Sequence, residues 1–142
     1  MVSRVIPMSE LDKTTPVPTE IKLHQLSRQL EIAFNNGTRF ELPYEFLRVY
    51  SPSAEVRGHG PGQEVLQVGK KNIAIKGIEP VGSYAVTLTF SDGHDTGIYS
   101  WDYLYELGAN YVALWGRYVN RMEAAGASRE PLAGAPERPK AK

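Results

Sequence analysis

The feature that most constrains the fold of this chain is a tight-turn motif that occurs twice. Each time it lies between two segments in which apolar and polar residues alternate, and residues typical of a helix start follow. Asn36-Gly37 separates Leu30–Phe34 from Thr38–Leu42, in which apolar and polar residues alternate as in a half-buried strand. Asn-Gly tolerates the positive φ of a tight hairpin turn. Pro43 suits the first turn of a helix, and Pro52 ends that helix early. We therefore predict a β-hairpin followed by a short helix.

The same pattern returns later in the chain. An alternating strand, a turn, a returning strand and a helix N-cap follow one another at Val86–Phe90, Ser91-Asp92-Gly93, His94–Tyr99 and Ser100. A further strand is predicted before each copy, at Ile21–His24 and at Ile73–Ile78. Neither copy can cover its own sheet alone, so the two must pack together. The predicted fold class is α+β, mainly antiparallel β-sheet from two β-hairpin-plus-short-helix repeats.

An amphipathic helix is predicted after the second copy, because apolar residues at helical spacing form one stripe: Tyr111, Leu114, Trp115, Tyr118, Val119 and Met122. Asn110 is expected to cap its start and Gly126 its end. We predict one folded domain over residues 20–126. The polar, proline-containing ends, residues 1–19 and 127–142, are expected to be a flexible arm and a disordered tail.

Composition argues against several classes of function. Lysine plus arginine and aspartate plus glutamate number 16 each, so the formal net charge is zero and gives no strong field for nucleic acid or an anionic membrane. The chain has no cysteine, which excludes disulfides, thiolate nucleophiles and cysteine-bound zinc or iron–sulfur clusters. No segment has the length and apolar character of a membrane span or a signal peptide. We expect a cytoplasmic protein with no nucleic-acid or membrane partner.

Candidate site residues lie near the turns and in the glycine-rich connection at residues 53–71. Gly69-Lys70-Lys71 lacks the hydroxyl residue that ends a phosphate-binding P-loop. His94 lies beside Asp92 and Asp95, but neighbours on a strand point to opposite faces, so a hairpin-tip histidine is favoured over a metal ligand. A basic surface for an anionic ligand or partner is the remaining idea, against a solvated mixed surface: Arg48, Arg57, Lys70, Lys71 and Lys76.

Several motifs in order resemble the γ-butyrobetaine hydroxylase-like N-terminal domain family: Phe34-x-x-Gly37, Leu42-Pro43-Tyr44, Ser51-Pro52-Ser53-Ala54-Glu55-Val56-Arg57-Gly58-His59-Gly60, and Phe90-x-Asp92-Gly93-His94 with Tyr99-x-Trp101. The resemblance covers about residues 20–107. In eukaryotic carnitine-synthesis oxygenases the related domain precedes the catalytic barrel and binds a structural zinc ion. In bacteria it also stands alone, and in some proteins it is joined to an Mrp/ApbC-type P-loop ATPase that carries iron–sulfur clusters.

The resemblance implies a lost zinc site. Three zinc-binding cysteines of the oxygenases correspond to Ser51, Ser53 and Val56, and the fourth ligand corresponds to His94. Serine and valine are poor replacements for thiolates, so we expect no structural zinc and no cofactor. The resemblance also implies that the two segments meet in space. Hydroxylase activity is not expected, because the residues for iron and 2-oxoglutarate belong to a separate domain.

The favoured function is a non-catalytic binding or adaptor domain of a bacterial cytoplasm, with a protein partner linked to iron–sulfur cluster assembly through an Mrp/ApbC-type ATPase. The expected contact surface combines the loop after the first helix with residues near the turns: Arg48, Arg57, His59, His94 and Trp101. Two alternatives remain open. One is a small enzyme or binding domain for an anionic metabolite that uses His59 and His94. The other is a structural oligomer with the 111–122 helix as its interface.

Overall fold

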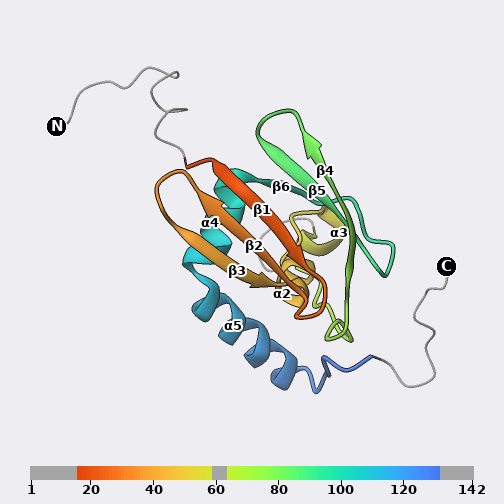
Figure 1. The fold of residues 1–142 in the computed structure, drawn as a ribbon. Helices are drawn as coiled ribbons and strands as arrows, with labels where there is room; N and C mark the ends of the chain where they lie inside the picture. Colours follow the sequence, from red (N-terminus) through yellow and green to blue (C-terminus); the bar gives the residue numbers. More distant parts are fainter. Residues whose placement is uncertain (1–15, 59–63, 132–142) are drawn as a thin grey trace.

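Two three-stranded antiparallel sheets carry the fold of the computed structural model, which describes residues 16–58 and 64–131. The first sheet has the order β1 (Pro18–His24), β2 (Gln29–Phe34), β3 (Arg39–Pro43), and the second has the order β4 (Ile75–Val81), β5 (Ala85–Phe90), β6 (Ile98–Ser100). Each sheet leads directly into a helix, α2 (Tyr44–Val49) after β3 and α4 (Trp101–Ala109) after β6 (Figure 1). The predicted α+β fold class and the repeated unit are confirmed.

The two hairpin turns have the same backbone geometry. Gly37 and Gly93 both have φ of 90°, a value that favours glycine. In the first turn the Phe34 amide donates to the Thr38 carbonyl at 2.8 Å, and in the second the Phe90 amide donates to the His94 carbonyl at 2.9 Å. The same turn chemistry therefore sets the register of both hairpins.

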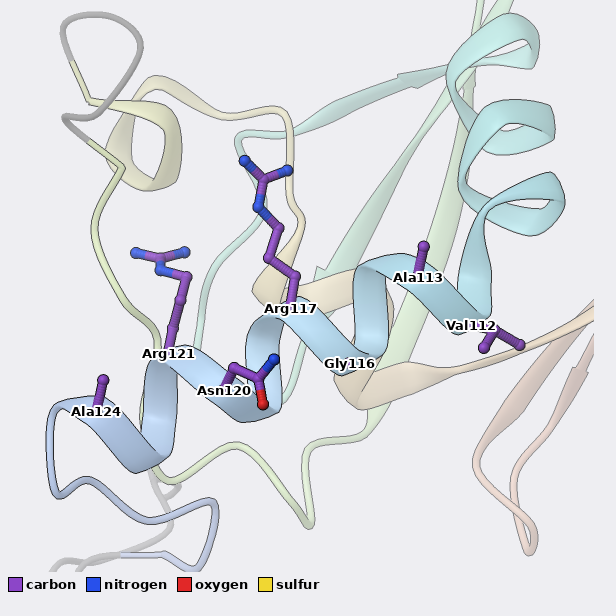
Figure 2. Close-up of a pocket in the computed structure, with 7 residues that line it drawn as sticks. All are labelled: Val112, Ala113, Gly116, Arg117, Asn120, Arg121 and Ala124. Carbon is purple, nitrogen blue, oxygen red and sulfur yellow. The ribbon is translucent and has the colours of Figure 1, made fainter.

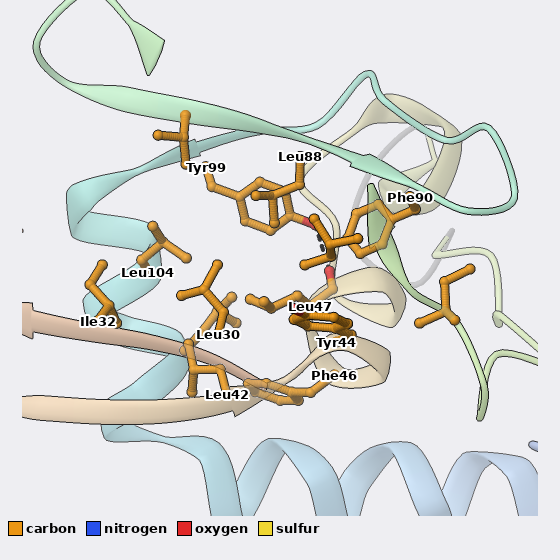
Figure 3. Close-up of a cluster of buried hydrophobic side chains, with 14 of the residues drawn as sticks. Leu30, Ile32, Leu42, Tyr44, Phe46, Leu47, Leu88, Phe90, Tyr99 and Leu104 are labelled. Carbon is orange, nitrogen blue, oxygen red and sulfur yellow. Dashed lines mark hydrogen bonds between the residues drawn. The ribbon is translucent and has the colours of Figure 1, made fainter. Parts of the chain in front are cut away.

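The core lies between the two sheets (Figure 3). Apolar side chains of the first sheet face those of the second, and α2 and α4 add residues between them: Leu30, Ile32 and Leu42; Leu88, Phe90 and Tyr99; Tyr44, Phe46, Leu47 and Leu104. The hydroxyl of Tyr99 is buried and donates to the Leu47 carbonyl at 2.5 Å. This bond satisfies a polar group inside the core and ties β6 to α2.

Helix α5 (Tyr111–Ala124) packs its apolar stripe inward, as the spacing predicts. Tyr118 and Met122 are buried in a small cluster with Val49 of α2. This stripe contacts the chain's own core, so an oligomer interface on this helix would have to use its outer face. None of the helices in residues 16–58 and 64–131 is long and apolar enough to cross a bilayer.

The predicted caps of α5 are half right. Gly126 has φ of 63° just after the helix, as expected for a residue that ends one. The Asn110 side chain, however, does not cap α5. It donates to the Glu106 carbonyl at 2.9 Å and closes α4 instead, because only one residue separates the two helices.

Two further local predictions are corrected. A short helix, α3 (Ala54–Arg57), lies inside the segment read as a glycine-rich connection, and the Ser53 hydroxyl caps it by accepting from the Glu55 amide at 3.1 Å. The returning strand of the second hairpin is only β6, because residues 94–97 leave the ladder and contact the segment between α2 and α3.

The folded part is longer than residues 20–126. Strand β1 begins at Pro18, and the segment 127–131 pairs with the 69–71 segment through a 2.9 Å bond from the Gly69 amide to the Ser128 carbonyl. Arg129 donates two bonds, 2.7 and 2.8 Å long, to Glu45, whose exposure is only 6%. The rest of the predicted arm and tail, residues 1–15 and 132–142, lies outside the described residues.

These contacts predict a cost for removing the 127–131 segment. A chain ending at Gly126 leaves Glu45 buried without its arginine, so we expect a loss of about 2 kcal/mol in the free energy of unfolding. This figure lies below that for a fully buried pair because the Arg129 side chain is 40% exposed. Urea unfolding measures the loss, and a chain ending at Pro131 is the control. Equal midpoints for the two chains would contradict the prediction.

Candidate functional site

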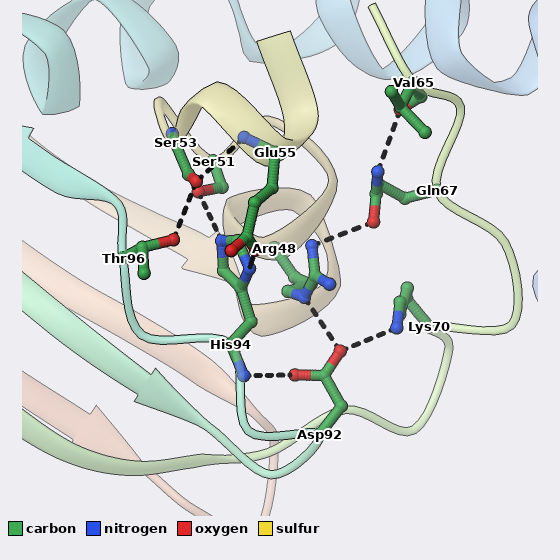
Figure 4. A network of polar contacts seen from close by, with 10 residues as sticks. All are labelled: Arg48, Ser51, Ser53, Glu55, Val65, Gln67, Lys70, Asp92, His94 and Thr96. Carbon is green, nitrogen blue, oxygen red and sulfur yellow. Dashed lines mark hydrogen bonds and ion pairs between the residues drawn. The ribbon is translucent and has the colours of Figure 1, made fainter. Parts of the chain in front are cut away.

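The segment after α2 and the segment after β5 lie against each other, at the positions that correspond to the zinc ligands of the related domain. The Ser51 hydroxyl lies 2.8 Å from His94 Nε2, and the Ser53 hydroxyl lies 2.7 Å from the Thr96 hydroxyl (Figure 4). Gly97 completes the contact, because a methyl group in its place would collide with Ser51 Oγ. We call these residues the loop junction. The expectation that the segment after α2 approaches His94 is correct.

His94 is buried and held on several sides. Its Nδ1 lies 3.1 Å from Glu55 Oε1, and its amide donates to Asp92 Oδ1 at 3.1 Å. Burial of the ring and the nearby positive charge of Arg48 lower the pKa of His94, against the opposing charges of Asp92 and Glu55. The imidazole is therefore neutral near pH 7.

Asp92 forms ion pairs with two of the basic side chains that were predicted to form a basic surface. Arg48 Nε donates to it at 2.9 Å and Lys70 Nζ at 2.6 Å (Figure 4). Burial alone would raise the pKa of Asp92, but the Lys70 hydrogen bond and the Arg48 charge prevail and lower it to about 2. Lys71 also has a partner, Glu130, at 2.7 Å. Three members of the predicted basic surface, Arg48, Lys70 and Lys71, are therefore paired with carboxylates and are not free to bind an anionic ligand.

The loop junction has the atom order of a serine–histidine–carboxylate triad but the wrong exposure for catalysis. In a hydrolase the serine must reach the substrate. Here Ser51 is only 1% exposed, whereas the Glu55 side chain is 66% exposed. A substrate would meet the carboxylate before the hydroxyl. The geometry suits a hydrogen-bonded support for two loops better than a nucleophile.

The residues at the loop junction do not fit a zinc ion. The positions that correspond to the other three ligands hold the hydroxyls of Ser51 and Ser53 and the buried apolar side chain of Val56, whereas zinc in structural sites takes thiolate, imidazole or carboxylate ligands. Across residues 16–58 and 64–131, no three His, Cys, Asp or Glu side chains gather closely enough to hold a metal ion.

The remaining predicted contact residues do not form one surface. Trp101 donates from its indole nitrogen to the Ser83 carbonyl at 2.8 Å, which places it at the β4–β5 turn, at the opposite end of β5 from His94. Its inclusion in a site with His94 is corrected. His59 lies outside the described residues. Arg57 lies over the ring of Tyr103, 5.1 Å from its centroid.

Arg57 belongs to a cleft that sequence reasoning missed. A cavity of about 510 Å³ lies between the α2–α3 segment and helices α4 and α5, and we call it the arginine cleft after the two arginines in its lining: Val49, Tyr50, Ser51, Val56, Arg57, Gly58, Glu64, Val65, Tyr103 and Arg121. Its members come from segments far apart in the chain, so no local motif marks them. Only Arg57 of this lining was predicted from the sequence as a contact residue that the structure places in the cleft.

A second hollow lies on the outer side of α5 (Figure 2). All its lining residues come from this one helix, and several have small side chains: Val112, Ala113, Gly116, Arg117, Asn120, Arg121 and Ala124. A single helix face cannot enclose a ligand. Figure 2 shows the side chains of Arg117 and Arg121 extending from α5 toward the side where α3 lies.

Fold and site together define a class of protein: a two-sheet α+β domain in which a hairpin-plus-helix unit occurs twice and the loop after the first helix meets a histidine after the second turn. The chain belongs to the γ-butyrobetaine hydroxylase-like, N-terminal family, whose model matches residues 21–105. The resemblance stated from the sequence is confirmed.

Solved structures show the same relationship. Two proteins with solution structures determined by NMR are similar: one is 55% identical with a TM-score of 0.72 over 93% of this chain and 96% of its own, and the other is 46% identical with a TM-score of 0.72 over 85% and 95%. A protein of unknown function of the DUF971 family from Acidithiobacillus ferrooxidans is 39% identical, with a TM-score of 0.55 over 65% of this chain and 92% of its own. The comparison with curated proteins found no match.

The lowered pKa values predict how stability depends on pH. His94 stays neutral in the folded state but takes up a proton in the unfolded state below about pH 6.5. The free energy of unfolding is therefore highest above that pH and falls as the pH decreases. Asp92 adds a second fall between about pH 4 and its folded pKa of about 2. Urea unfolding of wild type and His94→Gln between pH 7 and pH 5 checks the first step, and identical slopes would contradict it.

The loop junction also predicts that a metal site can be restored. Changing Ser51, Ser53 and Val56 together to cysteine would place three thiolates beside His94, a donor set that suits a tetrahedral ion. We expect this triple variant to bind cobalt(II) with thiolate-to-metal charge-transfer absorption, which wild type lacks. Adding His94→Gln should weaken the binding. A triple variant without that absorption would contradict the correspondence between these positions and zinc ligands.

Proposed function

We propose that this domain is a non-catalytic binding or adaptor domain whose contact site is the arginine cleft. The observation that carries the proposal is the composition of the cleft, in which an apolar floor of Val49 and Val56 meets arginines from two different helices, Arg57 of α3 and Arg121 of α5. A concave apolar surface with a few convergent polar groups is the usual form of a binding site.

Hydrogen bonding favours the cleft over the loop junction as the contact site. At the junction the polar groups bond to one another, so a ligand would have to displace bonds that already exist. In the cleft, Arg121 donates to the Glu64 carbonyl at 3.4 Å and Arg57 rests on an aromatic ring. A guanidinium has five N–H donors, so such contacts leave donors for a partner.

The family resemblance suggests which partner to test first. Because the related domain is joined to Mrp/ApbC-type ATPases in some proteins, we propose a partner of that class and a role in iron–sulfur cluster assembly. The domain would act there by binding. Although Ser51 borders the cleft, it is only 1% exposed and its hydroxyl is bonded to His94 and to the Ser53 amide, which supports a role without covalent catalysis.

The test uses two matched substitutions in one exposed segment. Val65 lines the cleft and Val68 does not, and both side chains are exposed. We expect Val65→Trp to fill the cleft and to abolish binding of a purified Mrp/ApbC-type ATPase in biolayer interferometry, while Val68→Trp binds like wild type. Equal binding by both variants would overturn the cleft as the contact site. No binding by wild type would remove this ATPase class as the partner.

A further inference from the structure

We propose that the arginine cleft is specific for a peptide segment that carries one carboxylate beside an apolar side chain. The inference rests on the proposed function, since it specifies the chemistry of that contact site. Its basis is the combination of charge, apolar surface and donor positions in the cleft lining.

The charge of the lining matches a single negative charge. Arg57 and Arg121 contribute two positive charges and Glu64 contributes one negative charge, so the lining has a net charge of +1. One carboxylate neutralises it. A doubly charged phosphate would leave an excess negative charge near Glu64, and a neutral ligand would leave one positive charge of the lining uncompensated.

The two arginines enter the cleft lining from different helices. Arg57 approaches from α3, where it is held 5.1 Å from the centroid of the Tyr103 ring, and Arg121 approaches from α5. The positive charges of Arg117 and Arg121 reach Tyr50 in the same wall, where they act against the effect of burial on its pKa. Guanidinium groups bind carboxylates through paired, charge-assisted hydrogen bonds, which gives both strength and orientation.

The tyrosines of the cleft supply apolar surface and not hydrogen-bond donors. The Tyr50 hydroxyl already donates to the Leu114 carbonyl at 2.7 Å, and the Tyr103 hydroxyl donates to the Tyr50 carbonyl at 2.5 Å. Their rings stand beside a floor of buried valines, Val49 and Val56. An apolar side chain next to the carboxylate would therefore find a matching surface. With both hydroxyls engaged, the carboxylate must be bound by the arginines.

The size of the cavity agrees with a short segment as the ligand. Its volume of about 510 Å³ lies within the range of about 300–1,000 Å³ that is usual for ligand sites. The carboxylate together with one neighbouring apolar side chain would occupy the space between α3 and α5.

The experiment is an NMR titration of the full chain with acetyl-Leu-Asp-Leu-amide. We expect amide shifts at residues of the cleft and at least tenfold weaker binding of acetyl-Leu-Asn-Leu-amide, which differs only in charge. Arg57→Gln and Arg121→Gln should each weaken binding of the aspartate peptide about tenfold, as expected for loss of a charge-assisted bond. Lys76→Gln, at an exposed position on β4, should bind like wild type.

Each contrary outcome overturns a defined part of the inference. Equal binding of the two peptides would exclude carboxylate specificity, and stronger binding of inorganic phosphate would assign the arginines to that anion. Isovalerate binding as tightly as the peptide would replace the peptide with a small organic acid. If no probe binds, the inference fails, while the proposed function is still judged by the Val65→Trp and Val68→Trp pair.

Discussion

The fold depends on one constraint: each sheet has an apolar face that it cannot cover alone. Leu30 and Ile32 on β2 and Leu88 and Phe90 on β5 are almost completely buried because the two faces cover each other. Three-stranded sheets of this size are not stable with one apolar face in water. The packing also fixes where the loops lie, since it brings the segment after α2 against the loop that follows β5.

The loop junction shows how such a contact is kept without a metal. In the resembling domain thiolates and an ion join these segments, whereas here hydroxyl groups bond directly to His94 and Thr96. Neutral hydrogen bonds are individually weak, and burial makes them costly to leave unmade. The His94 imidazole is neutral, and Gly97 has no side chain that would collide with Ser51, so the two segments approach closely enough for these bonds to form. We interpret the junction as a structural support, and we propose the neighbouring arginine cleft as the binding surface.

The parts of the site differ in how far sequence could predict them. The meeting of Ser51 with His94 was predicted from the family resemblance, because the related domain holds a zinc ion between the corresponding positions. The pairing of Arg48 and Lys70 with Asp92 was not, because all three charges lie on loops or helix ends whose approach depends on packing. The grouping of Trp101 with His94 was wrong for a similar reason: the helix signal at Ser100 does not say near which end of β5 the helix begins.

What the sequence determined by itself is local: the hairpin turns at Gly37 and Gly93, the helix after Pro43 and the inward stripe of the last helix. These follow from backbone preferences and from periods of two and 3.6 residues, which are set within a few neighbours along the chain. Only the tertiary structure decided which charged side chains form ion pairs and which line the arginine cleft. Arg57 and Arg121 are 64 positions apart in the chain, and only the packing of α5 against the α2–α3 segment brings them to one cavity.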